Sequence, residues 1–249
     1  MQNNFRVTFI NNKKILEYID EDIKILFTTK DFGSFSTNDS EKYLELFQEI
    51  NYDNKSIILS DQIHENHVEI IKEGKEEVLR LKETDGMVTN LSGVSLCTVY
   101  ADCVPLFFYD KTKKVVASSH SGWKGTAKNI AKKTIEIMKK EYNCKPKDIK
   151  CLIGPSISQK NYEVDEKVFK AIKNVTNTDK IAIKNGEKYY LDLWEANKIL
   201  LEKEGIISEN IIISGFCTYE FRELFYSYRR EGLDAGRMTG IIFIEKKPS

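Results

Sequence analysis

The chain has 249 residues, of which 41% are apolar and 31% are charged, a composition typical of a globular protein. Its 38 basic residues balance 38 acidic ones, which argues against a surface that binds nucleic acid or an anionic membrane throughout. The longest apolar stretch, 94–109, contains Asp102 and is too short to cross a bilayer. The N-terminal segment has no apolar stretch behind a basic one, so we expect no secretion signal and a cytoplasmic location.

Short runs rich in Val, Ile, Phe and Tyr predict strands at 6–10, 23–29, 56–59, 94–100, 104–109, 115–119, 149–153, 211–214 and 241–244. Apolar residues at helical spacing predict helices at 40–50, 126–142, 165–175 and 192–204. Three strands follow one another between 94 and 119 without a helix, which favours antiparallel or mixed sheets. We therefore expect one α/β domain over residues 1–249, with two sheets covered by helices.

Histidine is scarce in this chain, which contains only His64, His67 and His120. Three imidazoles cannot supply both a mononuclear copper and a three-copper cluster, so a multicopper oxidase is excluded. The sequence also lacks the G-x-S-x-G elbow of serine hydrolases, the G-x-G-x-x-G dinucleotide motif and the P-loop motif. The sequence therefore does not carry the common signatures of a serine hydrolase, a dinucleotide-binding fold or a P-loop protein.

Arginine is also scarce, and four of the six arginines lie between residues 222 and 237. A planar guanidinium suits the binding of phosphate or carboxylate, although a structural ion-pair network would use arginine for the same reason. Residues 225–230 alternate aromatic and polar side chains as a strand does. Aromatic faces beside arginines would suit a flat base together with an anion, while the alternative is an ordinary core strand.

The five cysteines include no C-x-x-C pair, so we expect no disulfide framework. Cys103 lies where Asp102 interrupts two strand-like runs, His120 ends the next strand, and His64 follows another. These three side chains could converge as a catalytic zinc site with a fourth position left open. The alternatives are a core cysteine with two unrelated histidines, or a Cys103 nucleophile with His120 as its base. His67 should point away from such a site.

Five blocks of this sequence resemble the laccase-domain, or multicopper polyphenol oxidase-like, proteins, which are understood as purine nucleoside phosphorylases. They occur in order over residues 25–245, and the Asp-Cys and His-Ser-Gly-Trp-Lys-Gly blocks are highly specific. The blocks are Gln62-Ile63-His64, Ala101-Asp102-Cys103-Val104-Pro105, His120-Ser121-Gly122-Trp123-Lys124-Gly125, Ile153-Gly154-Pro155-Ser156-Ile157 with Tyr162-Glu163-Val164, and Ser227-Tyr228-Arg229-Arg230 with Gly236-Arg237-Met238.

The resemblance implies a layered α/β/β/α fold, a cytosolic location and a monomer or weak oligomer. It makes His64, Cys103 and His120 the ligands of Zn²⁺, and it implies phosphorolysis of adenosine, inosine and methylthioadenosine, with adenosine deamination as a second reaction. The expected partners are thus purine nucleosides and phosphate, with no nucleic acid and no membrane. Some family members are linked instead to editing of peptidoglycan precursors.

Within this family reading, Cys103 and His120 are the expected catalytic residues, and Asp102 or Glu65 is the candidate for proton transfer. Arg229, Arg230 or the helix start at 122–126 would hold phosphate. Lys30 stands where the family usually has an arginine and is expected to contact substrate through one point charge.

Two other classes of function stay open from the sequence. One is a cysteine- or zinc-dependent hydrolase that edits cell-wall precursors. In its cysteine form it would use Cys103 as its nucleophile and His120 as its base. A non-catalytic zinc-stabilised interaction module would normally close the fourth position of the metal with protein.

Overall fold

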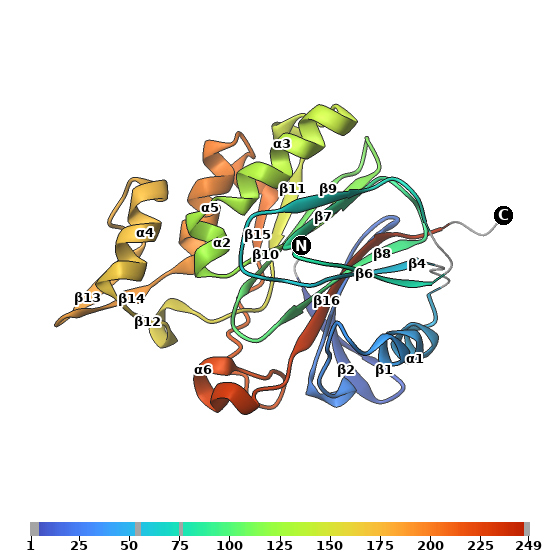
Figure 1. Cartoon of the computed structure of the whole chain (residues 1–249), viewed down its shortest axis with the longest axis horizontal. Coiled ribbons are helices and arrows are strands. Elements are labelled where there is room, and N and C mark those ends of the chain that lie inside the picture. The colour runs from blue at the N-terminus through green and yellow to red at the C-terminus, as the bar shows by residue number, and fades with distance from the viewer. Residues whose placement is uncertain (1–4, 53–55, 75–76, 247–249) are drawn as a thin grey trace.

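Two mixed β-sheets stack face to face at the centre of the protein (Figure 1). The computed structural model describes residues 5–52, 56–74 and 77–246. One sheet has seven strands in the order β1 (Arg6–Ile10), β2 (Lys13–Asp20), β3 (Ile23–Thr28), β16 (Met238–Ile244), β8 (Val94–Tyr100), β4 (Ser56–Ser60) and β6 (Val78–Leu81). The other has six, in the order β15 (Ile211–Ile213), β11 (Lys150–Ile153), β9 (Val104–Asp110), β10 (Val115–Ser121), β7 (Gly86–Thr89) and β5 (Val68–Ile71).

Helices cover the outer face of each sheet (Figure 1). Helices α3 (Ile130–Tyr142), α4 (Glu166–Thr176) and α5 (Leu193–Lys203) lie on the six-stranded side, and α1 (Ser40–Ile50) lies on the seven-stranded side. Two short helices, α2 (Trp123–Ala127) and α6 (Tyr228–Glu231), complete the set together with single 3₁₀ turns. A small third sheet joins β12 (Glu163–Asp165), β14 (Lys188–Leu191) and β13 (Ala182–Asn185). Among the described helices, none is long and apolar enough to cross a membrane.

The predicted α/β/β/α layering is confirmed by three separate apolar cores. One core lies between the two sheets, one lies under α3 to α5, and one lies under α1. The contact between the sheets is close at Gly240, where a Cβ atom would lie 2.6 Å from Cζ of Phe107. Three apolar interfaces at the packing density of protein interiors make the sandwich a stable support for a site at its edge.

The strong β-type runs of the sequence are all strands, and the predicted mixed pairing is confirmed, since β4 runs parallel to both β6 and β8. Two local predictions are wrong. The helix predicted over 126–142 is two helices, because Asn129 adopts a left-handed φ of 52° and its side chain caps α3 by accepting the N–H of Lys132. The segment 225–230 is a short loop, 225–227, followed by the first residues of α6, because Ser227 caps that helix instead of pairing in a sheet.

A buried carboxylate, that of Asp20, ties the two sheets together at the end of β2. The carboxylate of Asp20 accepts hydrogen bonds from the Tyr109 hydroxyl (2.7 Å), from Lys111 (2.8 Å) and from Lys150 (3.0 Å). Burial alone would raise the pKa of Asp20, but these three donors lower it from 3.8 to about 2. The ionised carboxylate is therefore more favourable in the folded state than in the unfolded state.

Asp20→Asn should lower the free energy of unfolding at pH 7 by about 1–3 kcal/mol, because two lysines lose a charged partner. A lowered folded-state pKa contributes stability that is present above the unfolded pKa near 4 and is lost as the pH falls towards 2. Urea unfolding should therefore show a difference in the free energy of unfolding between Asp20→Asn and the unaltered protein, and this difference should be smaller at pH 2 than at pH 7. Asp234→Asn, at an exposed residue, is the control, and an equal difference at both pH values would contradict the interpretation.

Candidate metal centre and active-site cavities

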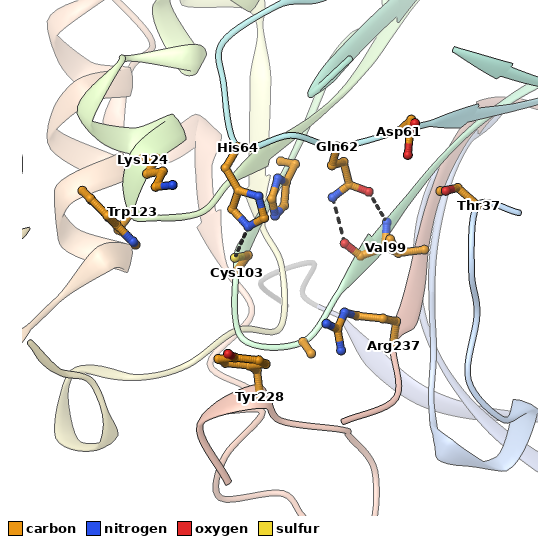
Figure 2. Close-up of a pocket in the computed structure, with 12 residues that line it drawn as sticks. Thr37, Asp61, Gln62, His64, Val99, Cys103, Trp123, Lys124, Tyr228 and Arg237 are labelled. Carbon is orange, nitrogen blue, oxygen red and sulfur yellow. Dashed lines mark hydrogen bonds between the residues drawn. The ribbon is translucent and has the colours of Figure 1, made fainter. Parts of the chain in front are cut away.

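Three chain segments bring His64, Cys103 and His120 together. Figure 2 shows the side chains of His64 and Cys103 pointing toward one another. His64 lies in the loop after β4, Cys103 lies in the turn between β8 and β9, and His120 lies near the end of β10. Their ligating atoms all lie within 4.8 Å of one another, and Sγ of Cys103 is 3.9 Å from Nε2 of His64. The predicted convergence of these three residues is thus present in the structure, and His67 instead contacts Glu69 at 3.2 Å.

The electrostatics of this cluster favour a thiolate. Burial alone would raise the pKa of the Cys103 thiol, but the adjacent imidazoles of His120 and His64 lower it. For His120 the direction is opposite: burial alone would lower the pKa of the imidazole, while the Cys103 thiolate and Asp85 raise it. Thiolate is the form of cysteine that binds metal ions and acts as a nucleophile, so the cluster provides the donor set of a metal centre.

The absence of a side chain at Gly122 leaves room for the Cys103 thiol. At Gly122, a Cβ atom would lie 2.8 Å from Sγ of Cys103 and 3.4 Å from Cδ2 of His64. A side chain at this position would therefore occupy the space between two of the ligands. Two imidazole nitrogens and a thiolate around this space fit a metal ion of the zinc type, which takes N and S ligands in four-coordinate sites.

Asp85 is a site residue that sequence reasoning missed. It is fully buried at the start of β7, and its carboxylate accepts a hydrogen bond from Nδ1 of His120 at 2.9 Å. The same carboxylate accepts the backbone N–H of His64 at 2.9 Å. The residue lies 35 positions from His120 in a segment without a motif, so no local signal in the sequence marks it.

Asp102 anchors the C-terminal part of the chain to the site. It adopts a φ of 83°, which turns the chain just before Cys103. Its carboxylate accepts hydrogen bonds from the Thr218 hydroxyl (2.6 Å), the Ser227 hydroxyl (3.0 Å) and the backbone N–H of Arg229 (2.7 Å). Because both oxygens are engaged, the geometry gives Asp102 a structural task beside the proton-transfer task predicted for it.

Two cavities open at the metal centre, and His64 and Cys103 lie in the walls of both. The larger has a volume of about 540 Å³, and its remaining lining includes Asp61, Lys124 and Arg237. Figure 2 shows Tyr228 and Arg237 on one side of this cavity and Gln62 on the other, where Gln62 is held by two hydrogen bonds to the backbone of Val99. The smaller cavity, of about 280 Å³, is lined by more apolar residues, namely Ile157, Tyr162 and Leu193 together with Trp123 and Tyr228.

The three predicted substrate-binding residues lie in different surroundings. Arg229 borders the smaller cavity, where its guanidinium lies over the Tyr162 ring and donates to the carbonyl of Glu163 at 2.9 Å. Arg230 donates to the carbonyls of Thr218, Tyr219 and Phe225 and to the carboxylate of Glu231. Lys30 pairs with the same carboxylate at 3.2 Å, and neither Lys30 nor Arg230 lines either cavity.

The remaining candidate for proton transfer, Glu65, pairs with Lys128 on the surface. Its side chain is 45% exposed, and it does not line either of the two cavities. The helix start at 122–126 forms only the five-residue helix α2. Within the two cavities, positive charge thus comes from Lys124, Arg229 and Arg237, two of which sequence reasoning did not assign to substrate.

Residues 34–245 match the family model described as multi-copper polyphenol oxidoreductase laccase. The chain belongs to this family. A family member of Bacillus subtilis, named purine nucleoside phosphorylase YlmD, is 40% identical over 200 residues, which cover 77% of this chain and 72% of the relative. Another, purine nucleoside phosphorylase SERP0752 of Staphylococcus epidermidis, is 33% identical over 261 residues, which cover 94% of this chain and 97% of the relative.

The crystal structure of the hypothetical protein YfiH from Bacillus licheniformis has the same fold. It superposes with a TM-score of 0.88, over 97% of this chain and 99% of that chain, at 28% sequence identity. The family resemblance and the fold predicted from the sequence are therefore confirmed.

Cys103→Ser should remove most of the bound metal from the purified protein, because a serine hydroxyl is a weak ligand compared with a thiolate. Cys144→Ser is the matched control, since Cys144 is a buried thiol whose pKa is raised to about 12 by burial and by Asp110. Elemental analysis of protein purified without added metal measures the effect. Equal metal content in both variants would exclude Cys103 as a ligand.

Proposed function

We propose that this chain is a zinc-dependent purine nucleoside phosphorylase that acts on adenosine, inosine and methylthioadenosine and also deaminates adenosine. The observation that carries the proposal is the position of His64 and Cys103, which lie in the walls of two adjoining cavities. Relatives that are 33–40% identical to the chain are named purine nucleoside phosphorylases. A site with room for two ligands beside one metal centre is what a reaction between a nucleoside and phosphate requires.

The ligand set supports zinc. His64, Cys103 and His120 supply two nitrogens and one sulfur, and three protein ligands with an open fourth position are typical of catalytic zinc. When bound there, zinc would supply hydroxide near neutral pH, which is the nucleophile that deamination of adenosine to inosine and ammonia requires.

The shape of the two cavities supports phosphorolysis. In that reaction a phosphate oxygen forms a bond to C1′ of the ribose while the glycosidic C–N bond breaks, and the purine leaves with the bonding electrons and takes up a proton. The phosphate and the base must then lie on opposite sides of the ribose. The smaller cavity, with its aromatic and aliphatic lining, suits the flat base, and the larger one offers Lys124 and Arg237 to the phosphate.

Of the three predicted substrate-binding residues, we retain Arg229, because it borders the cavity that we assign to the base. We assign Asp102 to the support of this wall, since it holds the backbone N–H of Arg229. The roles predicted for Lys30 and Arg230 would require release of their shared partner, Glu231. In the present conformation Lys30 and Arg230 are therefore both paired with Glu231.

A cysteine hydrolase that edits peptidoglycan precursors is the second candidate, and one observation favours it. The thiol of Cys103, the imidazole of His120 and the carboxylate of Asp85 lie in contact in that order, and the imidazole lowers the pKa of the thiol. A thiolate committed to zinc is a poor free nucleophile, so metal content separates the two candidates. Full metal occupancy together with loss of activity on chelation would favour the phosphorylase.

Incubation with adenosine and phosphate should yield adenine and ribose 1-phosphate, together with some inosine from deamination. Product chromatography with and without phosphate measures both reactions, and adenine should form only when phosphate is present. Chelated protein should be inactive yet still folded by far-UV circular dichroism, because three apolar cores hold the fold without the metal. If metal-loaded protein converts no nucleoside at any phosphate concentration, the phosphorylase proposal is wrong.

Lys124→Gln should raise the KM for phosphate by roughly ten- to a hundredfold, because a charge-assisted hydrogen bond contributes about 1.5–3 kcal/mol. Lys128→Gln is the matched control, since Lys128 lies four residues further on and pairs with Glu65 outside the larger cavity. Steady-state kinetics at varied phosphate concentration gives the comparison. An unchanged KM in the Lys124 variant would move the phosphate away from this part of the cavity.

A further inference from the structure

One carboxylate contacts the segments that carry two of the three ligands. Oδ1 of Asp85 accepts hydrogen bonds from Nδ1 of His120 and from the backbone N–H of His64, both at 2.9 Å. Oδ2 accepts the backbone N–H groups of Ile63 at 3.2 Å and of Glu65 at 2.9 Å. Four donors from two separate segments thus converge on a side chain that is fully buried.

We infer that Asp85 is a positioning residue that sets the orientation of both imidazole ligands towards the metal. For His120, Asp85 fixes the tautomer of the ring. A carboxylate that already receives three backbone N–H groups is an acceptor only, so the proton of the imidazole must lie on Nδ1. In the neutral imidazole that binds a metal, Nε2 of His120 then carries the free lone pair, and this nitrogen is left to face Cys103 and a bound metal.

For His64, Asp85 restrains the backbone. This residue adopts a φ of 63°, a left-handed conformation that is uncommon for residues other than glycine. A conformation of this kind persists only where the surrounding structure holds it in place. The three consecutive N–H groups of residues 63–65 all point at Asp85, which supplies that restraint and directs the side chain of His64 towards Cys103.

The place of Asp85 is itself fixed by the sheet. Its backbone carbonyl accepts the N–H of His120 at 2.7 Å, so β7 and β10 are in register at this point. The next residue, Gly86, allows the two strands to approach, since a Cβ there would lie 3.0 Å from Oγ of Ser119 and 2.9 Å from the Val68 side chain. The aspartate is therefore held by backbone contacts while its side chain holds the two histidines.

Asparagine has nearly the same shape as aspartate but cannot replace its hydrogen bonding. Its amide nitrogen would face either the N–H groups of Ile63 and Glu65 or the pair formed by the His64 N–H and the His120 ring. In the first case the backbone N–H groups of Ile63 and Glu65 would face the NH₂ group, which is itself a donor and cannot accept their hydrogen bonds. In the second case the ring of His120 must place its proton on Nε2, which removes the lone pair that would bind the metal.

The test is the affinity for Zn²⁺, measured by competition with a chromophoric chelator. Asp85→Asn should bind Zn²⁺ about 10- to 100-fold more weakly than the unaltered protein. Asp110→Asn is the matched control, because Asp110 is also a buried aspartate at a strand end and accepts a backbone N–H, that of Lys113, at 2.9 Å. An Asp85 variant that binds Zn²⁺ as tightly as this control would overturn the inference.

A second measurement needs no variant and so does not depend on the folding of Asp85→Asn. Nitrogen-15 NMR of the histidine side chains in the Zn²⁺-loaded protein should show His120 protonated on Nδ1. A proton on Nε2 of His120 would overturn the inference. Neither measurement involves a nucleoside or phosphate, so the result stands apart from the success or failure of the proposed function.

Discussion

Two buried carboxylates hold the site together, and each does so by accepting hydrogen bonds from segments that are far apart in the sequence. Asp85 joins the loop after β4 to strand β10, and Asp102 joins the turn before β9 to residues 218–229. A buried carboxylate without partners would be costly, but three or four donors offset the loss of water. The candidate site is therefore built around two carboxylates that the fold itself buries.

The layered fold explains why such a site can exist. Each sheet is covered on its outer face by helices and on its inner face by the other sheet, so the strand ends are the places where side chains can face a cavity. His64, Cys103 and His120 lie at or just beyond such strand ends, and Cys103 packs against the core between the sheets, which includes Phe107. Rigid strands supply the precision that a three-ligand centre needs, while loops supply the walls of the cavities.

Much of this architecture follows from the sequence, and the parts that do not have identifiable causes. Runs such as Val94–Tyr100 and Val104–Asp110 are so rich in β-forming residues that their strands were predicted almost to their ends. The strand Lys13–Asp20 was missed because its charged residues interrupt the apolar pattern. The break at Asn129 was missed because a left-handed asparagine inside a helical pattern has no signature of its own.

The candidate site, like the fold, was predicted from the sequence only in part. The positions of His64, Cys103 and His120 at predicted strand ends left their convergence open, and the family resemblance made them the expected ligands. In the structure their ligating atoms lie within 4.8 Å of one another. Arg230 was chosen because arginine is scarce, yet its guanidinium binds carbonyl groups whose convergence exists only in the folded chain. Asp85 was not chosen, because its importance arises entirely from contacts with segments 20 and 35 residues away.

The absence of a side chain at Gly122 has a consequence for the substitutions that this scaffold tolerates. Space for the sulfur of Cys103 depends on an absent side chain, so a replacement there would displace the thiol, which packs only at the margin of the core between the sheets. Evolution could therefore silence the chemistry and keep the scaffold with one substitution. A relative that retains both histidines and the cysteine but carries a larger residue at this position would be expected to be a pseudoenzyme.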